Sequence, residues 1–103
     1  MWRYEIYLPL KFNDGRAVPG ELFTQVRDEL LEKYGGLTLL PPDSPVEGWW
    51  KSEGVLYKDD IVIYKVTTDD DEDLFFIQYQ KELAHRFDQV KIWIEKIPIY
   101  PLR

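Results

Sequence analysis

Apolar and polar residues alternate along the first ten positions of the chain, MWRYEIYLPL. Trp2, Tyr4, Ile6 and Leu8 fall on one side of an extended chain, with charged or amphipathic residues between them. Successive side chains of a strand point to opposite faces, so the pattern predicts a strand over 1–10 with one face in the core.

Two later stretches have the spacing of helices instead. Apolar residues recur every three or four positions over 18–36, with Pro19 near the start and a pair of glycines at the end, which predicts the first helix. A second helix is predicted over 67–87, where Thr68 or Asp69 can cap the start and the run DDDED complements the positive end of the helix dipole. Its expected inner stripe is Phe76, Tyr79, Leu83 and Phe87.

The remaining segments are predicted to be extended. A short piece over 37–40 is stopped by the proline-rich loop PPDSP. A hairpin or bent edge strand is expected over 48–60, and an inner strand, apolar on both faces for part of its length, over 61–68. The segment 89–101 closes the chain as a strand in which Val90, Ile92 and Ile94 alternate with polar or amphipathic residues.

This order of strands and helices defines the fold class. It is β-α-β-β-α-β, the ferredoxin-like split βαβ arrangement of an α+β domain, in which one antiparallel sheet carries both helices on one face. The first and third strands are expected at the centre. The other face of the sheet is then left open.

Composition narrows the range of functions and partners expected for the chain. At 103 residues, 45% of them apolar, the chain is predicted to form a single domain over 1–103. A net charge of −6 argues against nucleic acid and against an anionic membrane surface as partners. The chain has no cysteine, so cysteine usage leaves the redox compartment undetermined. Its first residues lack the apolar block of a secretory signal, so a cytoplasmic location is the expectation.

Few residues offer catalytic or metal chemistry. His85 is predicted to lie opposite the apolar stripe of the second helix, where it is solvated or faces a partner. The DDDED run lacks the glycine hinge and the later bidentate glutamate of a calcium loop, and a helix start accounts for it. Neither a nucleophile elbow nor a glycine-rich phosphate loop is present, so no catalytic residue, metal or cofactor is predicted.

Several short motifs carry a resemblance to a known family. They are FNDGRAVP, YGGLTLLP, EGWW, DDIVIYKVTT and YQKELAHRFDQVKIWIEK. In order and spacing they resemble a family of small bacterial domains of unknown function, with a DG loop, a GLT strand and a GxW segment. The resemblance implies a ferredoxin-like fold and no particular activity. The family's glycine-flanked tryptophan corresponds to Trp49 or Trp50.

The adjacent tryptophans raise the main functional question. If 48–60 is extended, Trp49 and Trp50 point to opposite faces. We expect one to pack under the helices and the other to serve an interface or the mouth of a pocket. The candidate interface or ligand residues are Tyr7, Glu47, Trp49, Trp50, Tyr64 and Trp93.

Two functions follow from these candidates. The first is a non-catalytic interaction domain that forms a homodimer through the open face of its sheet, because buried aromatic side chains dominate interface energetics. The alternative is a small-molecule binding protein or enzyme with a pocket beside the segment PPDSPVEGWW.

Overall fold

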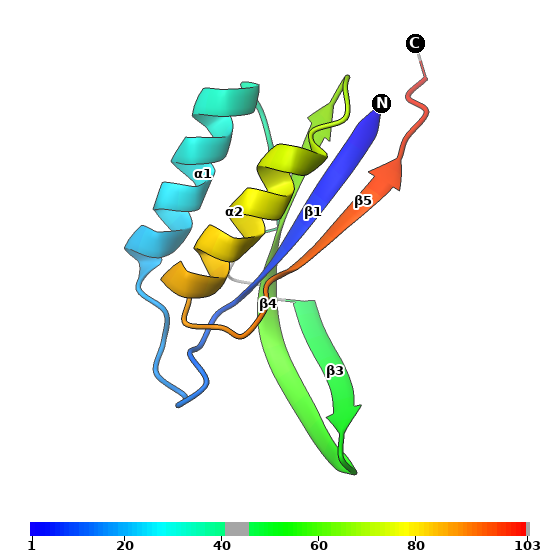
Figure 1. The fold of residues 1–103 in the computed structure, drawn as a ribbon. Coiled ribbons are helices and arrows are strands. Elements are labelled where there is room, and N and C mark those ends of the chain that lie inside the picture. Colours follow the sequence, from blue (N-terminus) through cyan, green and yellow to red (C-terminus); the bar gives the residue numbers. More distant parts are fainter. Residues whose placement is uncertain (41–45, 103) are drawn as a thin grey trace.

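The computed structural model describes residues 1–40 and 46–102, which form one antiparallel sheet and two helices. The elements in chain order are β1 (Trp2–Pro9), α1 (Gly20–Tyr34), β2 (Thr38–Leu39), β3 (Val46–Ser52), β4 (Val55–Thr68), α2 (Asp73–Arg86) and β5 (Trp93–Pro98). Both helices lie on the same side of the sheet (Figure 1). The predicted α+β ferredoxin-like class is therefore confirmed.

The sheet has the order β2-β4-β1-β5, and β3 pairs with β4 outside this path. The central strands are thus β1 and β4. They are the first strand and the inner strand over 61–68, which the split βαβ arrangement counts as its first and third strands and places at the centre. β1 pairs with β4 from Trp2 opposite Thr68 to Pro9 opposite Ile61. On its other side β1 pairs with β5, with Tyr7 opposite Trp93.

The core lies between the sheet and the two helices. Its fully buried members include Tyr4, Ile6 and Leu8, which confirms the alternation in the first strand. α1 contributes Val26 and Leu30, while α2 and the turn after it contribute Phe76, Tyr79, Leu83 and Phe87. This is the inner stripe predicted for the second helix.

Polar contacts tie the helices together at the outer edge of this core. Arg86 of α2 donates two hydrogen bonds to the Glu29 carboxylate of α1, one of them with an Nη2–Oε2 distance of 3.1 Å. The Tyr79 hydroxyl donates to the same carboxylate at 3.0 Å. The Arg86 guanidinium is the main cause that holds the pKa of Glu29 below its usual range.

β4 is much longer than its neighbours and gives the molecule its asymmetric outline. Residues 61–68 belong to the main sheet, while residues 55–61 pair with β3 to form a hairpin. The hairpin extends beyond the helices at one end of the sheet (Figure 1). Its two-residue turn is Glu53-Gly54, and both residues have positive φ, 51° and 80°, as a type I′ turn requires.

Two predicted boundaries are wrong. α2 begins at Asp73 rather than near Thr68, which is still part of β4. Polar contacts form a turn before the helix: the Thr68 hydroxyl donates to the Asp70 carbonyl at 2.7 Å, and the Asp73 N–H donates to the Asp71 carboxylate at 2.8 Å. β5 begins only at Trp93, and Val90, expected to face inward, is fully exposed.

Candidate functional site

A groove of about 680 Å³ opens on the uncovered face of the sheet, where β1 ends and β5 begins. β1 stops at Pro9, which cannot donate a backbone hydrogen bond, whereas the β3–β4 hairpin continues past that point. The hairpin forms one side of the groove, and the segment leading into β5 forms the other. Its lining residues are Tyr7, Pro9, Gly48, Trp49, Trp50, Asp59, Ile61, Gln89, Lys91, Ile92 and Trp93.

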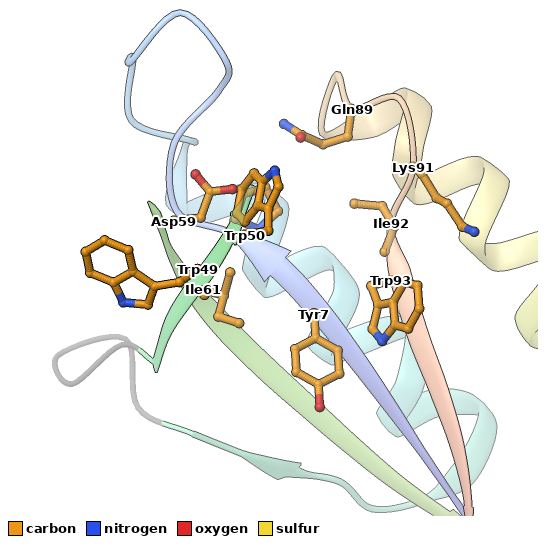
Figure 2. Close-up of a pocket in the computed structure, with 11 residues that line it drawn as sticks. Tyr7, Trp49, Trp50, Asp59, Ile61, Gln89, Lys91, Ile92 and Trp93 are labelled. Carbon is orange, nitrogen blue, oxygen red and sulfur yellow. The ribbon is translucent and has the colours of Figure 1, made fainter. Parts of the chain in front are cut away.

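Four of the predicted candidates line this groove, and the rings of three of them, Tyr7, Trp50 and Trp93, face it. Tyr7 lies on β1, Trp50 on the hairpin and Trp93 at the start of β5, so three elements distant in sequence each supply one aromatic ring. Figure 2 shows Tyr7 between Ile61 and Trp93, with Trp50 across the hollow. The Trp50 ring also stacks on its cross-strand neighbour Tyr57, with centroids 5.6 Å apart.

Trp49 is also among the lining residues, but its indole ring points away from the groove, so the two neighbouring indoles do diverge (Figure 2). Its indole N–H donates to Glu47 at 3.1 Å, and the Lys58 ammonium lies 5.7 Å from its ring centroid. These residues share the face of the hairpin that is opposite to Trp50. Glu47 is therefore a partner of Trp49 and lies outside the groove.

The expectation that one tryptophan packs under the helices is wrong. Trp49 is 56% exposed and Trp50 45% exposed. The reason is the length of β4: the hairpin that carries both residues extends past the ends of the helices, so neither of its faces is covered by them (Figure 1).

Tyr64 lies on the opposite, covered face of the sheet. It is 1% exposed, and its hydroxyl donates to the Phe23 carbonyl at 2.9 Å. Burial raises its pKa to about 12.

The sequence pattern did not identify Asp59, Ile61 and Lys91 as lining residues. The pairing of Asp59 with Gly48 and of Ile61 with Val46 would have revealed the first two, had the hairpin register been known.

A polar network supports the floor of the groove. The Tyr7 hydroxyl lies 2.7 Å from Glu95 Oε1 and 3.0 Å from Glu5 Oε2, so two carboxylates share one hydroxyl proton. Glu5 is 7% exposed, and its charge is balanced by Arg3 Nε at 3.2 Å and Lys65 Nζ at 3.7 Å. The tyrosine is thereby held in one position beneath the groove.

The network also perturbs ionisation. Burial, followed by the hydrogen bonds to the two carboxylates, raises the pKa of Tyr7 well above its usual value of 10. The hydrogen bond from Tyr7 is the main cause that lowers the pKa of Glu95. Tyr7 is consequently a neutral hydrogen-bond donor at any pH near 7.

The groove combines aromatic rings with two charged side chains. Three aromatic rings supply apolar contact area, while Asp59 and Lys91 are the charged side chains that line the groove. Within residues 1–40 and 46–102, no group of three or more acidic, histidine or cysteine side chains is placed to hold a metal ion. The expected contribution of the PPDSP loop, residues 41–45, lies outside the described residues.

No helix in the described part of the chain is both long and apolar enough to cross a membrane.

The architecture and the groove define a small ferredoxin-like α+β domain with an aromatic surface on its open face. Two solved structures are similar to it over nearly the whole chain. One is a phage SAM lyase in complex with S-methyl-5'-thioadenosine, with 16% identity and a TM-score of 0.64 over 93% of this chain and 79% of that one. The other is the divalent cation tolerance protein Cut A1 from Thermus thermophilus, with 15% identity and a TM-score of 0.63 over 100% of this chain and 88% of that one.

At these identities the similarity establishes the fold alone. No protein-family model matches the chain, and no curated protein matches it either. Membership in the family suggested by the DG, GLT and GxW motifs therefore stays a prediction.

Proposed function

We propose that the chain is a non-catalytic interaction domain that forms a homodimer through the open face of its sheet. The observation that carries the proposal is the set of large exposed side chains on that face and on the same side of the hairpin. Trp93 is 57% exposed at the start of β5, and Trp50 and Tyr57 extend the aromatic surface along the hairpin. Exposed aromatic patches of this kind are typical of interfaces.

Charge also bears on the association. Two copies carry −6 each and repel one another at long range. On the open face itself, however, Arg3 and Lys65 accompany Glu5 and Glu95, so that surface is locally balanced. Apolar contact then supplies the net attraction, and added salt is expected to strengthen dimerisation by screening the repulsion.

Sedimentation velocity over a concentration series tests the proposal. Trp93→Ala is expected to weaken dimerisation by about 2 kcal/mol or more, since a buried tryptophan at the centre of an interface is a typical hot spot. Trp49→Ala is the matched control, because Trp49 is equally exposed but faces the other way. A wild-type chain that stays monomeric up to about 100 µM would contradict the proposal, since the dissociation constant of any dimer would then lie above that concentration.

A second candidate function is small-molecule binding in the groove. Its volume of about 680 Å³ is within the range of ligand pockets, roughly 300–1,000 Å³, and aromatic rings line it on three sides. Binding is tested by titrating a metabolite set against the protein while tryptophan fluorescence and melting temperature are followed. S-methyl-5'-thioadenosine belongs in the set because the similar phage lyase was solved with it. An empty screen, or a hit that Trp50→Ala leaves unchanged, would count against this candidate.

A further inference from the structure

Beyond β5 the chain continues as an apolar tail, residues 99–102, of which Tyr100, Pro101 and Leu102 are exposed. The Ile99 N–H donates to the Met1 carbonyl at 3.1 Å, which prolongs the pairing of β5 with β1 by one step. After that point Tyr100 is 89% exposed and Leu102 is 100% exposed. The tail leaves the sheet at the end opposite to the hairpin (Figure 1).

The composition of the tail suits it to docking. Residues 97–102 read IPIYPL and carry no charge, so they can approach another acidic chain without adding repulsion. Pro98 and Pro101 lack backbone N–H groups and hold the residues before them extended. A segment already extended loses little conformational entropy on binding, and grooves lined by aromatic residues are the usual sites for proline-containing segments of this kind.

The tail cannot reach the groove of its own chain. Ile99 and Trp93 are six residues apart along the extended strand, which corresponds to a distance of about 20 Å at 3.3 Å per residue. Residues 100–102 follow the last contact with the sheet, and three extended residues span about 11 Å at most. A tail that occupies the groove must therefore come from another copy.

A pair of copies with antiparallel strands satisfies this requirement. The tail and the groove lie at opposite ends of the open face, so when two such faces meet with their strands reversed, each tail comes over the other copy's groove. A two-fold arrangement of this kind is closed and self-complementary. The contact also places two highly exposed side chains, Tyr100 and Leu102, against the aromatic rings of the groove.

We infer that in the homodimer the tail of each copy, residues 99–102, lies in the groove of the other, with Tyr100 and Leu102 between Trp50 and Trp93. The inference rests on the proposed self-association and specifies its geometry. It also makes the groove a peptide site, which a small molecule could occupy only by displacing the tail.

The test compares two variants of the full chain, each with highly exposed apolar residues replaced. A tail variant with Tyr100→Ala and Leu102→Ala is expected to dimerise at least about tenfold more weakly than the wild type, equivalent to about 1.4 kcal/mol. Leu74→Ala is the control, because Leu74 is 88% exposed but lies on α2, on the other side of the sheet. Far-UV circular dichroism checks that both variants keep the native fold.

A mixing experiment separates the tail contact from simple pairing of the two faces. Trp50→Ala damages the groove and keeps the tail, whereas the tail variant keeps the groove. In a mixture of the two variants, the heterodimer can form one contact between an intact tail and an intact groove. Neither homodimer can form such a contact. Native mass spectrometry with one partner isotopically labelled is expected to show heterodimer in excess of the statistical fraction.

Each outcome distinguishes the two hypotheses. A wild-type monomer would overturn the proposed dimer and this inference together. A wild-type dimer whose dissociation constant does not change in the tail variant, or a purely statistical mixture, would overturn the tail contact alone. A synthetic peptide of residues 97–102 that competes for the groove would lower the dimer fraction, and failure to do so at millimolar concentration would contradict the inference.

Discussion

The shared hydroxyl of Tyr7 allows a sharp test of the groove floor. In Tyr7→Phe the ring stays, but Glu95 loses its donor at 2.7 Å and Glu5 loses its contact at 3.0 Å. Hydrogen bonds to charged groups contribute about 1.5–3 kcal/mol each, and solvent around the exposed part of Glu95 reduces this value. We therefore expect a loss of about 1–3 kcal/mol in the free energy of unfolding at pH 7, or a fall of about 4–8 °C in melting temperature for each kcal/mol.

The loss should depend on pH in a defined direction. The folded-state pKa of Glu95 is lowered, chiefly by Tyr7, so the stabilisation is present above the ordinary value of 4.5 and disappears as pH falls through the folded-state pKa. The difference between wild type and Tyr7→Phe is consequently largest above about pH 5 and shrinks in acid.

Urea unfolding followed by circular dichroism at several pH values measures this difference, and a side-chain carboxyl NMR titration reports the pKa of Glu95 directly. In Tyr7→Phe that pKa is expected to rise toward its ordinary value. Tyr57→Phe is the control, since no hydrogen bond of the Tyr57 hydroxyl is found in the described part of the chain. A Tyr7→Phe protein as stable as the wild type at pH 7, with the pKa of Glu95 unchanged, would refute the reasoning.

Two further substitutions test the fold beneath the site, each against a matched residue. Leu83→Ala removes a fully buried side chain of α2 and is expected to cost about 2–5 kcal/mol in urea unfolding, while Leu74→Ala on the same helix stays within about 0.5 kcal/mol. Equal effects would contradict the core assignment. Gly54→Ala places a Cβ at φ 80° in the hairpin turn and is expected to cost about 1–2 kcal/mol, whereas Gly36, which has an ordinary φ and open space around it, tolerates alanine. A Gly54→Ala protein with unchanged stability would exclude the type I′ turn.

Much of the fold was predictable because local patterns and tertiary packing agree there. The alternation in β1 and the stripe through Phe76, Tyr79 and Leu83 are dictated by burial on one face, and the structure buries these residues as expected. The sequence predicts the start of α2 too early because acidic residues suit both a helix N-terminus and the turn that precedes it. Only the side-chain contacts of Thr68 and Asp71 decide between these alternatives.

The site was predicted less completely, for a geometrical reason. Sequence alternation correctly indicated that Trp49 and Trp50 diverge, but it cannot report how far a hairpin extends beyond the helices. That length is set by the difference between the 14 residues of β4 and the 8 residues of β1. The same mismatch leaves residues 55–59 of β4 without β1 beside them, which opens the groove and exposes both tryptophans.

The length mismatch also links the groove to the proposed assembly. Had β1 been as long as β4, a continuous sheet would have filled the hollow, and the aromatic rings of Trp50 and Trp93 would have been separated by another strand. A domain of this size has a small core. Each large aromatic side chain left exposed lacks the stabilisation of about 1.5–3 kcal/mol that its burial would provide. Association through the proposed interface would offset that loss, because it would bury the hairpin, the groove and the apolar tail together.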